Sequence, residues 1–441
     1  MRSTPLLAAL LVAGAALAQK PPAPAATPPA PQTLSSAAER VYDFARPRIV
    51  QIRTLLQAAG RQTSLGSGFA VSADGLVITN YHVVSRFALD PRTYRLEYLA
   101  PDGAKGALEL LALDVAHDLA VVRMARTDLP HFDFDARALA GTLPKGERIY
   151  AIGNPLDLGF TIVEGTYNGL VDKSYDERIH FSGSINPGMS GGPVAAADGR
   201  VVGVNVAKRL DGEQVGFLVP AYYAAQLLER ARKGPKLADD KAREEVGRQL
   251  DAWQAAFYAA LKAGGFRSAA IGPYRGLESA APWVTCWAST NADVLPRPRT
   301  AVNTTRCTSA TGIFVSDRIL TGRIDFSHAY YKAVDLNSFQ FAKELSQRSG
   351  VADQRGGKRL TSQECRDDFV TAAPTGKPAL RATWCMRAYR EFEGLYDATL
   401  LVLTQDRDRE ALLASLSMQG VSHANAVAFG RRFLEAIEWR Q

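Results

Sequence analysis

Cysteine, histidine and long apolar runs are all scarce in this chain of 441 residues. The 4 cysteines and 6 histidines show neither C-x-x-C nor H-E-x-x-H spacing, so we expect no metal site. After residue 18 no segment stays apolar for the roughly 20 residues that a membrane-spanning helix needs, and we expect no membrane insertion of the mature chain. The net charge of +7 is spread along the chain without a basic run, which argues against a nucleic-acid partner.

The N-terminus has the pattern of an export signal. An early Arg2 is followed by a short apolar stretch, and small residues precede a cut expected after Ala18. A membrane anchor is the alternative, but the stretch is too short to cross a bilayer. We therefore predict a signal peptide over residues 1–18 and a periplasmic or secreted protein. Residues 19–33 are dominated by proline and alanine, which predicts an extended linker.

All cysteines lie in the second half of the chain, at Cys286, Cys307, Cys365 and Cys385. Their even number in an exported protein favours disulfides over free thiols or metal ligands. Three pairings are open. We expect Cys286 with Cys307 and Cys365 with Cys385, because short loops within β segments would bring these partners together.

Two regions of different pattern follow the linker. From residue 34 to 234, short apolar runs alternate with turn signals such as Asp74-Gly75 and Asp198-Gly199, which is typical of antiparallel hairpins. A helix is expected to close this region at Gly234. Residues 236–441 combine helices of amphipathic period with strand-like runs. We expect an all-β domain over 34–234 and a separate α+β domain of unknown role over 236–441.

Three segments contain the side chains needed for nucleophilic catalysis by serine. Such catalysis requires a base, a carboxylate that orients the base, and N–H donors for the oxyanion. The nucleophile Ser190 lies in NPGMSGGPV, whose glycines allow a substrate to approach the backbone closely. His82, at the expected end of the strand LVITNYHVV, is the general base, and Asp118, in AHDLAVVRM, orients it. The backbone N–H groups of Gly188 and Ser190 are the expected donors.

These residues resemble the trypsin-like peptidases, and among them the HtrA/DegP branch of bacterial periplasmic proteases. The resemblance covers roughly residues 45–225 and includes six strings in the family's order: GSGFAVSADGLVITNYHVV, DVAHDLAVVRM, YAIGNPLDLGFTIVEGTYNGLV, SINPGMSGGPV, DGRVVGVNV and VGFLVP. It implies a double β-barrel, the triad of His82, Asp118 and Ser190, and an oxyanion hole at the turn from Gly188 to Ser190.

The sequence departs from this family in two places. Met189 stands before the nucleophile, where the branch usually has Asn and trypsin has Asp. A methionine cannot form an ion pair with a new N-terminus, so activation by that route is excluded. Residues 236–441 do not resemble the PDZ domains that follow HtrA peptidases, so peptide capture by a PDZ domain is not carried over.

Three other catalytic assignments are open at this stage. The pentapeptide G-x-S-x-G also occurs at the nucleophile of α/β-hydrolases, but that fold orders its triad Ser, Asp, His, whereas this chain has His, Asp, Ser. Asp114 is an alternative to Asp118. His117 is an alternative base, although neighbours on a strand point to opposite faces, so we expect it to point away from the cleft.

The sequence therefore predicts an exported serine endopeptidase that works without a metal or an organic cofactor. Its partners are protein or peptide substrates. Ser184, six residues before the nucleophile, corresponds to the floor of the primary pocket in trypsin-like enzymes and predicts uncharged, small or aliphatic side chains before the scissile bond. The alternative is a peptide-binding or chaperone-like protein with low or partner-activated proteolysis. Oligomerisation stays open.

Overall fold

The computed structural model describes residues 36–154, 159–208, 216–309, 311–351, 354–370 and 377–440. The predicted signal peptide and linker lie outside these residues. In the described part, no helix is both long and apolar enough to cross a membrane.

Six antiparallel strands close the first barrel, in the order β1-β2-β3-β6-β5-β4. Helix α1 (Ser36–Ala45) and a 3-10 turn (Arg46–Arg48) lead into it. The turn at Asp74-Gly75 joins β2 to β3, as predicted, with Gly75 at φ +92°. The strands are β1 (Ile49–Leu56), β2 (Arg61–Ala70), β3 (Leu76–Thr79), β4 (Tyr94–Leu99), β5 (Lys105–Asp114) and β6 (Leu119–Met124).

A second closed barrel follows in the order β10-β11-β12-β9-β8-β7. Its strands are β7 (Arg148–Gly153), β8 (Thr161–Leu170), β9 (Ile179–Phe181), β10 (Pro193–Ala195), β11 (Val201–Lys208) and β12 (Gly216–Pro220). The short helix α3 (Ala136–Leu139) precedes it, and α4 (Ala221–Lys233) ends at Gly234 as predicted. The predicted double β-barrel is confirmed.

The predicted position of His82 at the end of a strand is wrong. Strand β3 ends at Thr79, and helix α2 (Tyr81–Leu89) begins one residue before the histidine. The segment YHVVSRFAL is mostly apolar and contains two valines, so its composition resembles that of a strand. In the fold, most of its side chains are buried against the first barrel, and tertiary packing outweighs the strand preference of the valines.

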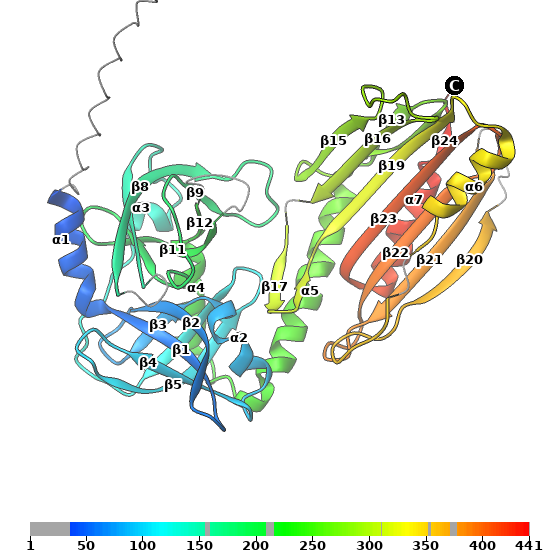
Figure 1. Cartoon of the computed structure of the whole chain (residues 1–441). Helices are drawn as coiled ribbons and strands as arrows, with labels where there is room; N and C mark the ends of the chain where they lie inside the picture. The colour runs from blue at the N-terminus through cyan, green and yellow to red at the C-terminus, as the bar shows by residue number, and fades with distance from the viewer. Residues whose placement is uncertain are drawn as a thin grey trace, which may run out of the picture.

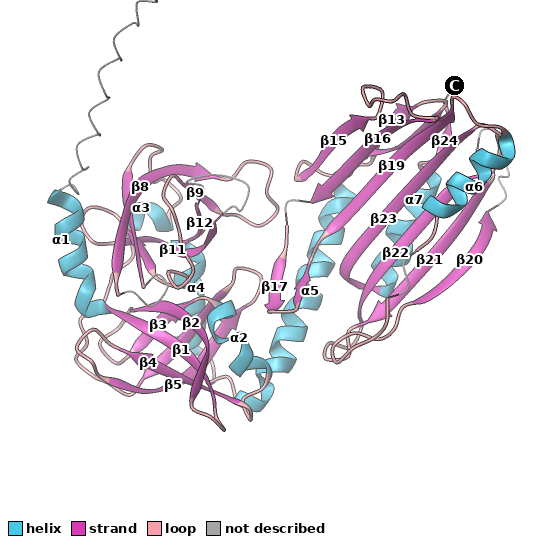
Figure 2. Ribbon diagram, viewed as in Figure 1, coloured by secondary structure: helices cyan, strands magenta, loops and turns pink. Residues whose placement is uncertain are grey.

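The C-terminal part is built on a seven-stranded antiparallel sheet with helices on both faces (Figures 1 and 2). The strand order is β15-β16-β19-β23-β22-β21-β20. These strands are β15 (Val284–Thr290), β16 (Thr300–Ser309), β19 (Ile324–Ala333), β20 (Glu364–Val370), β21 (Leu380–Ala388), β22 (Leu395–Thr404) and β23 (Glu410–Ser422). This mixture of sheet and helices agrees with the predicted α+β class.

Alternate side chains of the central strands pack on different helices. Phe326 and other residues on one face form a core with α5 (Ala242–Ala263) and α7 (His423–Glu435). Tyr331, on the opposite face, packs with α6 (Ser338–Arg348). Helix α7 stops at Glu435, and the buried Ile437 lies just beyond it.

Smaller strands and two disulfides complete the C-terminal part. Three strands form a side sheet, β13 (Arg267–Ile271), β14 (Tyr274–Ser279) and β24 (Glu438–Trp439), and a hairpin is made by β17 (Ile313–Ser316) and β18 (Ile319–Thr321). Both predicted disulfides are present, Cys286–Cys307 across β15 and β16 and Cys365–Cys385 across β20 and β21. Because each pair lies directly opposite on neighbouring strands, the short loops do bring the partners together.

The two parts of the chain are in direct contact along α5. The side-chain amide of Gln249 donates to the carbonyl of Leu113 at 2.9 Å, and its oxygen accepts from the N–H of Val115 at 2.8 Å. Trp253 donates its indole N–H to Asp176, in the loop between β8 and β9, at 2.9 Å. One continuous apolar core joins α5 to the first barrel. The helix therefore holds the C-terminal sheet against the barrels.

Candidate active site

His82 and Asp118 come together at one end of the first barrel. The imidazole Nδ1 lies 2.7 Å from Oδ2 of Asp118, and the backbone N–H of His82 donates to Oδ1 of the same carboxylate at 2.8 Å. Both carboxylate oxygens of Asp118 thus contact His82. The contact fixes the ring with Nδ1 toward the carboxylate, which leaves Nε2 as the nitrogen available for proton transfer.

The turn that carries Asp118 is held in an unusual backbone conformation. Asp118 has φ +58°, in the left-handed region that residues other than glycine rarely adopt. Its carbonyl accepts from the N–H of Tyr81 at 3.1 Å and from the side-chain amide of Asn80 at 2.8 Å. Because these two bonds join the turn to the start of α2, they fix the carboxylate relative to the histidine.

The pKa of His82 is raised above its ordinary value of 6.5. Burial alone would lower it, but the charge of Asp118 and the hydrogen bond to it outweigh burial. The charge of Asp317, from the C-terminal part, raises the pKa further. The ring side chain keeps 26% of its surface exposed, so it is accessible from outside.

The turn that carries Ser190 lies against the first barrel, close to the start of α2. The N–H of Ser67, on β2, donates to the carbonyl of Ser190 at 2.8 Å. A Cβ at Gly191, which has φ +82°, would come within 2.9 Å of the backbone nitrogen of Asn80, two residues before His82. Only glycine allows this close approach of the two barrels.

The hydroxyl of Ser190 donates to the carbonyl of Val206 at 3.0 Å. No hydrogen bond joins it to His82 in the part of the chain that the structure describes. A looser contact between nucleophile and base is usual in proteases without substrate, and it tightens when substrate binds. The structure therefore brings the serine and the histidine into one region but leaves them without a direct bond.

The expected oxyanion donors lie on the same turn. Gly188 has φ +95°, and among the described residues neither its N–H nor that of Ser190 has a hydrogen-bond partner. The buried hydroxyl of Ser67 donates to the carbonyl of Gly188 at 2.7 Å and accepts from the N–H of Asn154 at 3.0 Å. Sequence reasoning did not single out Ser67, although it lies in the quoted string GSGFAV.

The alternative residues Asp114 and His117 pair with each other and not with the site. The imidazole Nδ1 of His117 lies 3.0 Å from Asp114, whose carboxylate also pairs with Arg230 at 2.9 Å. The ring of His117 stacks on Tyr223. We expected His117 to point away from the cleft because neighbours on a strand alternate, but residues 115–118 form a turn, so this argument does not apply. Both residues nevertheless have partners of their own.

Two further residues singled out from the sequence lie in the loop before the nucleophile. Met189 is fully buried among apolar side chains of the second barrel, a position suited to an uncharged residue. Ser184 is exposed in the same loop. Its neighbours Gly183 and Ile185 lie against Gly216, at the start of β12.

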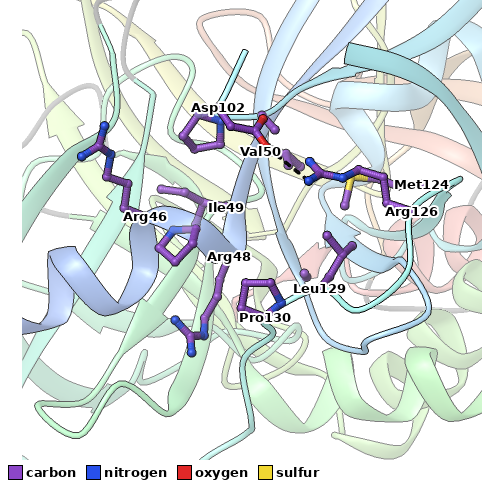
Figure 3. A pocket seen from close by; sticks show the side chains of 13 residues that line it. Arg46, Arg48, Ile49, Val50, Asp102, Met124, Arg126, Leu129 and Pro130 are labelled. Atoms are coloured by element: carbon purple, nitrogen blue, oxygen red, sulfur yellow. Dashed lines mark hydrogen bonds and ion pairs between the residues drawn. The ribbon is translucent and has the colours of Figure 1, made fainter. Parts of the chain in front are cut away.

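A separate cavity of about 350 Å³ lies at the end of the first barrel where β1 begins (Figure 3). Arg48, Asp102 and Arg126 line it, and Asp102 pairs with Arg126 at 3.2 Å. None of the predicted site residues lines this cavity. Across the described ranges, no cluster of three or more His, Cys, Asp or Glu side chains could hold a metal ion.

Comparison with known proteins agrees with the fold. Residues 66–204 match the family model described as trypsin-like peptidase domain. The putative serine protease HhoB of Synechocystis is 36% identical over 177 residues, which cover 38% of this chain and 40% of that protein. The probable periplasmic serine endoprotease DegP-like of Chlamydia pneumoniae is 33% identical over 174 residues, which cover 37% and 34% of the two chains.

Among solved structures, the serine endoprotease from Yersinia pestis is 27% identical, with a TM-score of 0.39 over 46% of this chain and 70% of that one. The chain spans less than half the length of the two curated relatives above. Its two-barrel part is a trypsin-like serine peptidase domain. Within that class, the sequence of this part is similar to those of HtrA-type peptidases such as the DegP-like endoproteases.

Proposed function

We propose that this chain is an exported serine endopeptidase that cleaves protein substrates through His82, Asp118 and Ser190. The observation that supports it most is the pairing of His82 with Asp118 beside the glycine-rich turn of Ser190. Each of the three side chains has the chemical type that its role requires. The export signal expected at the N-terminus, and relatives named as periplasmic, support a periplasmic or secreted location.

The reaction begins when a bound substrate displaces the Ser190 hydroxyl from the carbonyl of Val206. The hydroxyl oxygen then attacks the peptide carbonyl while Nε2 of His82 accepts its proton. The carbonyl oxygen becomes an oxyanion, which the free N–H groups of Gly188 and Ser190 stabilise. Asp118 keeps the imidazole oriented and stabilises its positive charge.

The tetrahedral intermediate collapses when His82 returns the proton to the leaving amine, which breaks the peptide bond and leaves an acyl group on Ser190. Water then attacks the acyl-enzyme with His82 as base, and the carboxylic acid leaves as the serine regains its proton. No step needs an oxidant, a metal or an organic cofactor. An uncharged Ser184 favours uncharged side chains before the scissile bond.

Digestion of casein by the purified full chain tests this proposal. We expect the wild type to digest casein and Ser190→Ala to lose this activity. Ser338→Ala, which removes an exposed serine at the start of α6, is the matched control and should digest at the wild-type rate. Equal digestion by wild type and Ser190→Ala would contradict the assignment. A folded wild type without activity would favour the binding or chaperone-like alternative.

A further inference from the structure

The β17–β18 hairpin extends from the C-terminal part to helix α2 of the first barrel (Figure 1). The buried hydroxyl of Tyr81 donates to the carbonyl of Val315 at 3.0 Å. Arg86, one turn further along α2, donates its Nε–H to Asp317 at 2.8 Å. The hairpin is therefore bound to the helix that carries His82, even though more than 200 residues separate them in the sequence.

The two faces of this hairpin differ. Side chains on one face, which include Ile313 and Val315, are buried. The other face carries Phe314 and Leu320, which lie directly opposite each other on the two strands. Leu320 keeps 66% of its surface exposed. One face thus anchors the hairpin, and the other carries the half-buried Phe314 and the exposed Leu320.

Phe314 lies next to the general base. Its ring centroid is 5.7 Å from that of His82, with the rings inclined at 67°. The histidine side chain is still 26% exposed, so the phenylalanine covers one side of the ring without closing off the site. Phe314 therefore lies beside an imidazole that can still be reached from solvent.

We propose that Phe314 and Leu320 form an apolar wall of the substrate cleft and select polypeptides with a large apolar side chain next to the scissile bond. This inference rests on the proposed function. A general base must lie within about 3 Å of the groups whose protons it transfers. The residues that flank the cleaved bond must therefore pass close to the ring that Phe314 contacts. Leu320 extends the same surface outward, where the substrate chain continues.

The pattern of cleavage sites tests this wall. Denatured casein is digested with wild type, Phe314→Ala and Leu320→Ala, and the cut sites are identified by mass spectrometry. We expect the preference for large apolar over small side chains within two residues of the cut to fall about tenfold in Phe314→Ala. A smaller fall is expected for Leu320→Ala. Phe339→Ala, which removes an exposed aromatic side chain from α6, should keep the wild-type preference.

Labelling of the wild type by a fluorophosphonate separates the two ways in which the experiment can fail. Absence of labelling would overturn the proposed function, and the wall with it. Labelling together with unchanged cleavage preferences in both hairpin variants would overturn the wall alone. Leu320→Ala keeps the test decisive if Phe314→Ala does not fold, because an exposed side chain contributes little to the core.

Discussion

Replacement of Ser67 by alanine should slow catalysis although this residue touches no substrate. Its hydroxyl links the two barrels, since it donates to the carbonyl of Gly188 at 2.7 Å and accepts from the N–H of Asn154 at 3.0 Å. Ser67→Ala leaves both backbone groups without their partner in a buried place. Each such group costs about 1–3 kcal/mol, so we expect the free energy of unfolding to fall by roughly 2–6 kcal/mol for the two groups together.

The same change should loosen the turn that presents the oxyanion donors. Complete loss of one such donor costs about 100- to 1000-fold in kcat, and a displaced donor should cost less. We expect kcat to fall about 10- to 100-fold with KM nearly unchanged, because the donors act on the transition state more than on the bound substrate. Ser67 is thus a positioning residue.

Steady-state kinetics on a peptide cut from casein, combined with urea denaturation, measure both effects. Ser85→Ala is a suitable control, because it removes a buried hydroxyl that bonds to the carbonyl of His82 within α2 and has no contact with the oxyanion turn. Its kcat should fall less than that of Ser67→Ala. A Ser67→Ala enzyme with the kcat of the Ser85→Ala control would refute the reasoning, and so would a loss confined to KM.

Three other substitutions test separate parts of the structure. Asp118→Asn should lower kcat by about 10³- to 10⁴-fold, whereas Asp114→Asn should change it little; comparable losses in a peptide assay would contradict the assignment of the orienting carboxylate. Asp317→Asn removes a charge that raises the pKa of the general base. Since the base must be neutral, the fall of kcat/KM at acid pH should move to lower pH, and an unmoved pH profile would speak against this coupling. Burial lowers the pKa of His328 to about 4, so this residue stays neutral in the fold while it gains a proton in the unfolded chain below pH 6.5. The free energy of unfolding of the wild type should therefore fall by up to about 3 kcal/mol from pH 7 to pH 4. The fall should be the same in the control His423→Gln, which changes an exposed histidine, but smaller in His328→Gln. Urea titrations at each pH measure this difference.

Local signals were sufficient for much of the fold. The turns at Asp74-Gly75 and Asp198-Gly199 mark hairpins because glycine accepts a positive φ there, and Gly75 and Gly199 have φ +92° and +86°. Both disulfides followed from the short separation of their cysteines across neighbouring strands. The helix around His82 was missed, since its short apolar segment fits a strand equally well until its packing is known.

The candidate site was predictable in part. The sequence identified His82 and Asp118, and the structure pairs them. It did not indicate the bond from Ser190 to Val206, because that bond depends on how the turn of Ser190 folds against β11. It did not indicate the bridge through Ser67 either, because that bridge depends on how the second barrel sits against the first. The contact of Phe314 with His82 has no local signature either. It arises only when a hairpin of the C-terminal part packs on α2, and sequence periodicity carries no information on such distant contacts.

The central claim is that Ser190 is a nucleophile activated by its surroundings, and covalent labelling tests it most directly. The purified full chain is treated with a fluorophosphonate, and the modified peptide is located by mass spectrometry. We predict one adduct on Ser190 in the wild type, and no adduct in Ser190→Ala or in wild type unfolded in urea. A folded wild type without this adduct, or equal labelling of Ser190→Ala, would contradict the account.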